Sequence, residues 1–144
     1  MRHRIFFFAT GLVVSACSTP QGITPIQPEL GHYSPTVVES LNPTFRWKLV
    51  SDPETLYDFA IFEVWSSGQP GKSVYYREGL KQPEHKVEEP LKPNMDYFWS
   101  VRPRQGTDIG EWATYDHKLF VPIPFGFYYQ GQGHLMFPFK TPPN

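Results

Sequence analysis

Short runs of aromatic and β-branched residues dominate residues 36–121, and proline, glycine, asparagine or aspartate separates them about every ten residues. Proline interrupts helices, whereas aromatic residues favour strands. The chain contains 16 prolines, 12 phenylalanines, 8 tyrosines and 4 tryptophans, and no segment shows the apolar period of a helix. This pattern predicts an all-β sandwich. We expect strands near residues 36–40, 44–49, 57–65, 74–77, 85–88 and 97–104, and a last strand that starts at Trp112 or Lys118 and ends at Val121.

Alternation within three of these segments predicts which side chains face the core. Successive residues of a strand point to opposite faces, so a face without charges is the one that is buried. The uncharged faces carry Phe45, Trp47 and Leu49, then Tyr57, Phe59 and Ile61, then Tyr97, Trp99 and Val101. Large residues of this kind are needed to fill the space between two packed sheets.

Three motifs carry a resemblance to the fibronectin type III family. The sequence PTFRW at 43–47 resembles the second strand of that family, and LKPNMDY at 91–97 is similar to the turn that leads to its tyrosine corner. YFWSVRPR at 97–104, followed by GEW at 110–112, resembles bacterial members. The resemblance covers residues 36–121 and implies an immunoglobulin-like sandwich of about seven strands. It also implies that the Tyr97 hydroxyl hydrogen-bonds to backbone upstream.

The first residues have the composition of a secretory signal peptide. Arg2, His3 and Arg4 precede an apolar run at 5–14, and small residues follow. Ten helical residues span roughly 15 Å, half of a hydrocarbon core, so this run is too short to cross a membrane. We therefore expect residues 1–16 to be a signal peptide.

The sequence Val14-Ser15-Ala16-Cys17 resembles the lipobox of bacterial lipoproteins. The resemblance implies that Cys17 receives a covalent lipid and becomes the mature N-terminus. Ser18 stands where the inner-membrane retention signal of that family has aspartate, which implies an outer-membrane anchor with the domain facing the periplasm. Cys17 is the only cysteine, so the chain forms no internal disulfide.

Residues 17–35 are rich in proline and lack apolar periodicity, which predicts a tether between the lipid and the domain. An extended polyproline conformation would let this tether reach up to roughly 50 Å.

Residues 122–144 form an aromatic and proline-rich C-terminal extension with a single charge, Lys140. Three interpretations remain open: residues 136–141 form the last strand, the segment folds back on the sandwich as a hairpin, or its aromatics bind a partner. The partner-binding candidates are Phe125, Phe127, Tyr128 and Tyr129.

Little in the sequence indicates catalysis or a cofactor. The formal charge is −1 and no basic run occurs, which argues against nucleic-acid binding. The histidines lack metal-site spacing, so we expect no metal and no cofactor beyond the lipid on Cys17. Asp116-His117 lacks a serine context, and Glu88-Glu89 would point to opposite faces of a strand. Arg102 and Arg104 share a face, with Arg77 as a possible neighbour, and we expect them to be surface charges.

Three function classes follow from these observations. We favour a non-catalytic, membrane-anchored module that binds or scaffolds an envelope protein. The alternative is a glycan- or peptidoglycan-binding module that uses exposed aromatics, and a hydrolase is a distant third. The aromatics available for stacking on sugars are Trp65, Tyr75, Tyr76, Tyr128 and Tyr129.

Overall fold

The computed structural model describes residues 23–31, 34–50, 52–118 and 132–144. This part of the chain consists of strands, turns and loops. The strands are β1 (Pro25–Gln27), β2 (Thr36–Val37), β3 (Thr44–Trp47), β4 (Leu56–Val64), β5 (Pro70–Leu80), β6 (Glu84–Lys86), β7 (Asp96–Gln105), β8 (Asp108–Ile109), β9 (Tyr115–Lys118), β10 (Gln132–Leu135) and β11 (Phe137–Lys140). The described residues contain no helix that could span a membrane.

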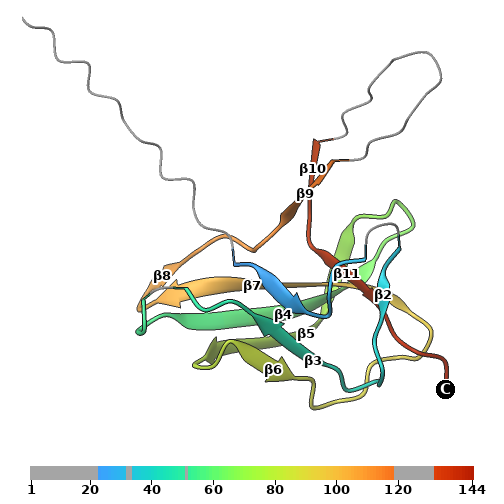
Figure 1. Cartoon of the computed structure of the whole chain (residues 1–144), viewed down its shortest axis with the longest axis horizontal. Coiled ribbons are helices and arrows are strands. Elements are labelled where there is room, and N and C mark those ends of the chain that lie inside the picture. The colour runs from blue at the N-terminus through green and yellow to red at the C-terminus, as the bar shows by residue number, and fades with distance from the viewer. Residues whose placement is uncertain (1–22, 32–33, 51, 119–131) are drawn as a thin grey trace, which may run out of the picture.

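The strands form two packed sheets, which confirms the predicted all-β sandwich. The large sheet has the order β2-β11-β7-β4-β5, with β8 paired to β7, and the small sheet has the order β1-β3-β6. Strands β9 and β10 pair only with each other among the described strands, and Figure 1 shows this hairpin projecting away from the sandwich.

Aromatic rings from both sheets fill the space between them. Phe45 of the small sheet has its ring centroid 5.0 Å from those of Phe59 and Trp99, and 5.1 Å from that of Phe139. Trp47 stacks on Phe59 at 6.1 Å. All five side chains are buried, and burying a large apolar side chain contributes about 1.5–3 kcal/mol, so this cluster stabilises the packing of the two sheets.

The predicted faces of β4 and β7 are confirmed, since their uncharged inward residues are fully or almost fully buried. The prediction for Leu49 is wrong. Strand β3 ends at Trp47, and Leu49, two residues beyond it, is 65% exposed. Alternation no longer assigns a face once the strand has ended.

Tyr97 is buried at the start of β7, where burial raises the pKa of its hydroxyl and a hydrogen bond with the backbone of Lys92, five residues upstream, partly offsets this rise. The turn between them contains Asn94 in a left-handed conformation, with φ of 53°. Asparagine tolerates this conformation better than most residues. The resemblance to the tyrosine corner implies a hydrogen bond of this kind between the tyrosine hydroxyl and backbone upstream.

The folded part begins earlier than the sequence indicates. Residues 17–35 were expected to be a tether, but Pro25–Gln27 form β1 and pair with β3. Ile23 is buried in the core, and Leu30 packs against it. A strand of three residues that begins with a proline and is followed by another is too short to show alternation, which explains why the sequence pattern missed it.

The last strand of the large sheet lies along β7 in two pieces. β8 pairs with the end of β7, and Ala113 donates a backbone hydrogen bond to Val101. β11 then continues along the first half of β7, with Phe137 opposite Trp99. The β9–β10 hairpin leaves the sheet between these two pieces (Figure 1). Of the alternatives for 122–144, the strand therefore lies at Phe137–Lys140, and it is part of the sandwich rather than an extension of it.

Candidate functional site

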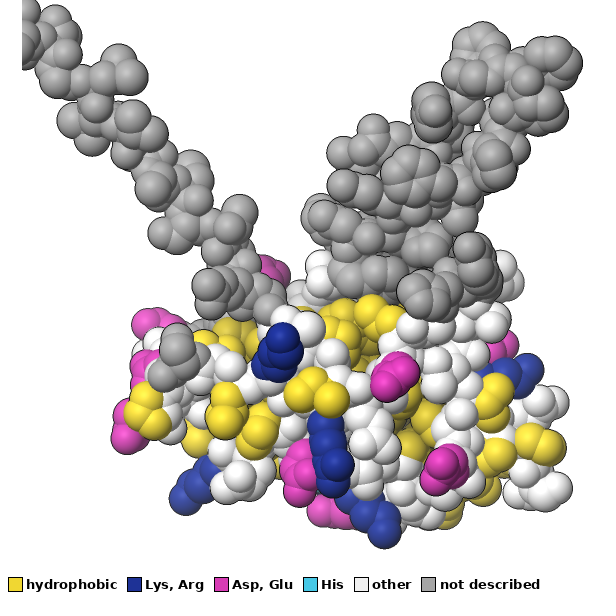
Figure 2. Space-filling view, in the orientation of Figure 1, with side chains coloured by type: hydrophobic (Ala, Val, Ile, Leu, Met, Phe, Trp, Pro, Cys, Tyr) yellow, Lys and Arg dark blue, Asp and Glu magenta, His cyan; other side chains and the backbone are white. Residues whose placement is uncertain are grey.

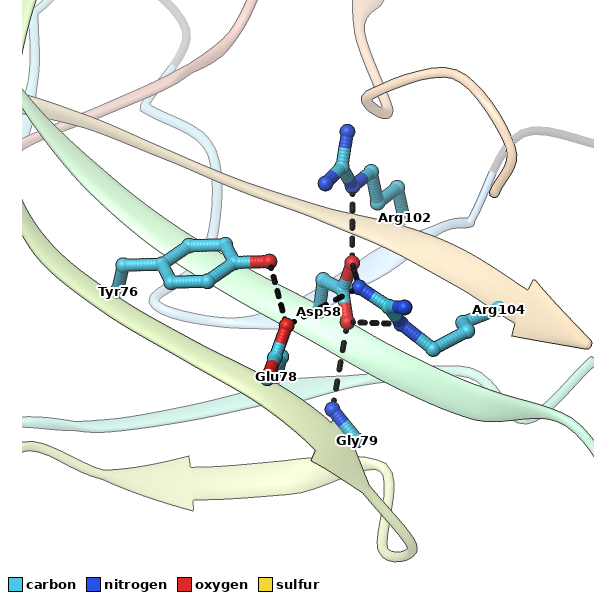
Figure 3. Close-up of polar contacts among 6 residues, drawn as sticks. All are labelled: Asp58, Tyr76, Glu78, Gly79, Arg102 and Arg104. Carbon is cyan, nitrogen blue, oxygen red and sulfur yellow. Dashed lines mark hydrogen bonds and ion pairs between the residues drawn. The ribbon is translucent and has the colours of Figure 1, made fainter. Parts of the chain in front are cut away.

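A cluster of charged side chains occupies the outer face of the large sheet. In the antiparallel register of β4 and β7, Asp58 lies opposite Arg102, and Leu56 lies opposite Arg104. Both arginines converge on the Asp58 carboxylate (Figure 3). Arg102 Nε donates at 3.0 Å, and Arg104 donates through Nε at 2.9 Å and through Nη2 at 2.8 Å.

Strand β5 closes the other side of this cluster. The backbone N–H of Gly79 donates to Asp58 Oδ1 at 3.2 Å, so both carboxylate oxygens are engaged. Glu78 accepts from Arg104 at 3.2 Å and from the Tyr76 hydroxyl at 3.4 Å (Figure 3). Three adjacent strands are thereby tied together by side chains on one face of the sheet.

Asp58 is fully buried, yet its carboxyl is held in the charged form. Burial by itself raises the pKa of this carboxyl, but the hydrogen bonds from Arg104, Gly79 and Arg102 outweigh it, so the pKa lies below its ordinary value of 3.8. The carboxylate in turn raises the pKa of Arg104.

The two arginines are therefore engaged by the protein itself. The expectation that Arg102 and Arg104 share a face is correct, but they are not ordinary surface charges, because they pair with a buried carboxylate. Arg77 is elsewhere: it lies over the Tyr75 ring at 4.4 Å and pairs with Glu88. Its alternation with Tyr76 on β5 places it on the opposite face.

Trp112 covers the adjoining part of this outer face. Its ring meets Phe62 edge-on at 5.9 Å and Tyr76 at 6.5 Å, and the Arg102 guanidinium lies 4.5 Å above it. The segment is held in place because the Ser100 hydroxyl donates to the Ala113 carbonyl at 2.7 Å. The Trp112 ring thus covers part of the charged cluster, and Tyr76 at the edge of the cluster is 39% exposed.

A second feature is a largely apolar groove of about 390 Å³ at the base of the hairpin. Its lining residues are Ile23, Thr24, Pro25, Ile26, Glu29, Leu30, Thr114 and Phe137. Ile23, the first of the described residues, therefore lines the same groove as Thr114, which precedes β9, and Phe137, the first residue of β11. Ile26 at its edge is 49% exposed.

The surface elsewhere is mixed in character. Figure 2 shows one face, on which hydrophobic side chains are interspersed with basic and acidic ones. Among the described residues, no three His, Cys, Asp or Glu side chains lie close enough together to hold a metal ion.

The predicted site residues divide between the described and the remaining parts of the chain. Cys17, Phe125, Phe127, Tyr128 and Tyr129 lie outside the described residues.

Of the other aromatics expected to be available for sugars, Trp65 is 60% exposed and Tyr76 is 39% exposed, but Tyr75 is buried. Tyr75 points inward because it lies on the core face of β5, where its hydroxyl lies 2.8 Å from His85 Nε2. The prediction that Tyr75 is exposed is therefore wrong.

Sequence reasoning missed the carboxylate that organises the outer face. The signal was present, because Asp58 alternates with buried aromatics and so shares the outer face of its strand with Ala60 and Phe62. What the sequence does not contain is the register that sets Asp58 opposite Arg102.

Comparison of the chain with protein-family models, with curated proteins and with solved structures finds no match.

Proposed function

We propose that the protein is a non-catalytic, lipid-anchored module of the bacterial cell envelope that binds or scaffolds another envelope protein close to the membrane. The observation that supports this proposal most is the short distance in sequence between the lipobox cysteine and the fold. Ile23 is already a core residue, so only residues 18–22 separate it from Cys17. Six residue steps span at most roughly 20 Å when fully extended.

This distance changes the expected placement of the domain. A tether of residues 17–35 would allow roughly 50 Å between lipid and domain, whereas the segment from Cys17 to the buried Ile23 reaches at most roughly 20 Å. An acyl anchor on Cys17 would therefore keep the sandwich next to the bilayer. Ile23 shares a groove with Thr114 and Phe137, so the base of the hairpin would lie on the same membrane-proximal side.

The aromatic residues between β9 and β10 in sequence are our candidates for the partner contact. They comprise Phe125, Phe127, Tyr128 and Tyr129, and the sequence has no Lys, Arg, Asp or Glu at residues 119–139. Aromatic residues are enriched at protein interfaces, and charged residues are depleted there. A module held near the bilayer would bind a membrane protein or another partner at the membrane surface.

Binding to a protein is favoured over binding to a glycan. Sugar platforms need exposed aromatic rings with their faces available. Tyr75 is buried, and the Tyr76 ring stands at 76° to that of Trp112, so these two rings form no common plane. Trp65 remains as an exposed ring in the described part, without a second ring close to it there.

The anchor is tested by replacing Cys17 with Ala and following the protein by membrane fractionation and by incorporation of labelled palmitate. We expect Cys17→Ala to abolish the label and to release the protein from the membrane fraction. Its melting temperature should stay unchanged, because Cys17 precedes the first core residue, Ile23. Thr19→Ala is the matched control and should stay labelled and membrane-bound. A Cys17→Ala protein that remains labelled and in the membrane would contradict the proposal.

The partner contact is tested with photocrosslinking residues placed at 128 or 129 in intact envelopes. These positions should give a discrete crosslinked species, whereas a crosslinker at Asp108, an exposed residue of β8, should give none. Equal crosslinking at all three positions would argue against a binding role for the aromatic segment.

A further inference from the structure

Trp65 is the most exposed aromatic side chain among the described residues. It is the first residue after β4, in the turn that leads to β5, and it is 60% exposed. An indole combines a large apolar surface with a polar N–H group, and tryptophan is therefore enriched at protein interfaces and at membrane interfaces. The surroundings of Trp65 and its place in the fold indicate which of these two surfaces it meets.

The turn holds Trp65 in a defined position. The Trp65 N–H donates to the Gln69 carbonyl at 2.9 Å, and the Gly68 N–H donates to the Trp65 carbonyl at 2.8 Å. The indole ring lies directly against Gly71, where a Cβ atom would collide with Nε1 and Cδ1 of the ring. Glycine at 71 is therefore what lets the ring pack against the start of β5 while most of the ring stays exposed. A contact made by a ring that is already fixed costs little conformational entropy.

The turn around Trp65 carries no charge. Residues 64–71 read VWSSGQPG, and the nearest charged residues are Glu63 and Lys72. Residues 65–69 are all exposed. The interfacial region of a bilayer favours indole rings, whereas moving a charged group out of water is costly. A turn of this composition can therefore enter the headgroup region without desolvating a charge.

The turn lies on the side of the sandwich where the anchor enters. Glu63 of β4 and Phe139 of β11 both lie opposite Tyr97, so the β4–β5 turn follows the half of the large sheet to which β11 belongs. Figure 1 shows this turn and the β9–β10 hairpin projecting from the same side of the sandwich. Ile23 lines the groove at the base of that hairpin, and at most roughly 20 Å of chain separates it from Cys17.

From these observations we propose that Trp65 inserts into the interfacial region of the bilayer that carries the lipid anchor. The inference rests on the proposed function, because the short segment between Cys17 and Ile23 is what brings the turn to the membrane. A single ring binds a bilayer weakly, but an anchor on the same chain raises its effective concentration at the surface. The domain is then held at two points, the lipid and Trp65, and these two points set its orientation.

The experiment uses the protein purified from cell envelopes in mild detergent and incorporated into phosphatidylcholine vesicles whose acyl chains carry bromine, which quenches nearby tryptophans. Flotation of the vesicles first shows whether the protein is membrane-bound. We expect quenching of the tryptophan fluorescence, and stronger quenching when the bromine lies near the headgroup end of the acyl chain than when it lies near the chain end. Trp47 and Trp99 are buried in the core and should not contribute.

Two matched variants assign the signal. Trp65→Phe should lose the quenching, whereas Trp112→Phe should keep it, because the Trp112 ring lies on the outer face of the large sheet under the Arg102 guanidinium. Thermal unfolding checks that each variant is folded. Since Trp65 is exposed, its replacement should leave the melting temperature nearly unchanged.

The outcomes separate this inference from the anchor. A wild-type protein that does not float with the vesicles would overturn the anchor and, with it, the placement of Trp65. A protein that floats without quenching, or whose quenching persists in Trp65→Phe, would overturn the inference and leave the anchor standing. Retention on purified peptidoglycan that Trp65→Phe abolishes, without quenching in vesicles, would assign the ring to a glycan instead and would equally overturn the inference.

Discussion

Replacing Asp58 with Ala should cost more stability than any other single change to a charged residue on the outer face. The carboxylate is fully buried and accepts four hydrogen bonds, three from Arg102 and Arg104 and one from the Gly79 backbone. The two arginine side chains are themselves only 23% and 21% exposed. Removing one partner of such a pair leaves poorly solvated charges facing each other.

Breaking a buried ion pair in this way costs about 3 kcal/mol. For a domain of this size, 1 kcal/mol corresponds to about 4 °C, so Asp58→Ala should lower the melting temperature by about 12 °C. Asp58→Asn keeps the volume and one acceptor but loses the charge, and we expect an intermediate loss of about 2 kcal/mol.

The assay is chemical denaturation followed by tryptophan fluorescence, with thermal unfolding as a second measure. The matched control is Glu88→Ala, which removes the exposed ion pair with Arg77 and should leave the stability unchanged within error. If Asp58→Ala were as stable as this control, the outer-face cluster would not tie the strands together as described.

The pH dependence of the same variant follows from linkage. The folded-state pKa of Asp58 is depressed, so the stabilisation is present above the ordinary value of 3.8 and is lost as pH falls through the lower folded-state pKa. The stability difference between wild type and Asp58→Asn should therefore be constant near neutral pH and shrink only below about pH 4. A difference that shrinks already near neutral pH would contradict this assignment.

Three further changes test the core, the corner turn and a buried histidine. Phe139→Ala should cost about 3–5 kcal/mol in denaturation, because its ring is fully buried in β11, whereas Val37→Ala on the exposed side of β2 should cost little. Tyr97→Phe should cost about 1–2 kcal/mol through loss of the hydrogen bond with the Lys92 backbone, and an unchanged melting temperature would refute that role. Burial lowers the pKa of His85 below 6.5, so the unfolded state binds the proton more tightly and stability should fall as pH drops below that value. His85→Gln should remove this component of the pH profile; an identical profile would show that another group is responsible.

The fold class could be predicted because the alternation is local. Tyr57, Phe59 and Ile61 alternate within five residues and so indicate the core face of β4. The turn before Tyr97 is likewise indicated by its own sequence pattern. The length of β5 could not be predicted from the sequence, because the strand runs over Pro70–Leu80 although only residues 74–77 have the composition of a strand. Pairing with β4 extends it through Pro70 and Gly71, which have low strand propensity.

The parts that could not be predicted depend on contacts between distant segments. β1 is a strand because it pairs with β3. β11 pairs with β7 in the large sheet, although the β9–β10 hairpin, which is not part of that sheet, precedes it in sequence. The arginines of β7 were assigned to the correct face, but their partner is set by the register with β4, which no local pattern encodes.

We propose that a lipid on Cys17 holds the chain at the membrane. The most direct measurement is the mass of the N-terminal peptide of the protein isolated from cell envelopes. We predict a peptide that begins at Cys17 and carries acyl groups. A peptide that continues upstream through Ala16, or one that begins at an unmodified Cys17, would show that no lipid is attached there.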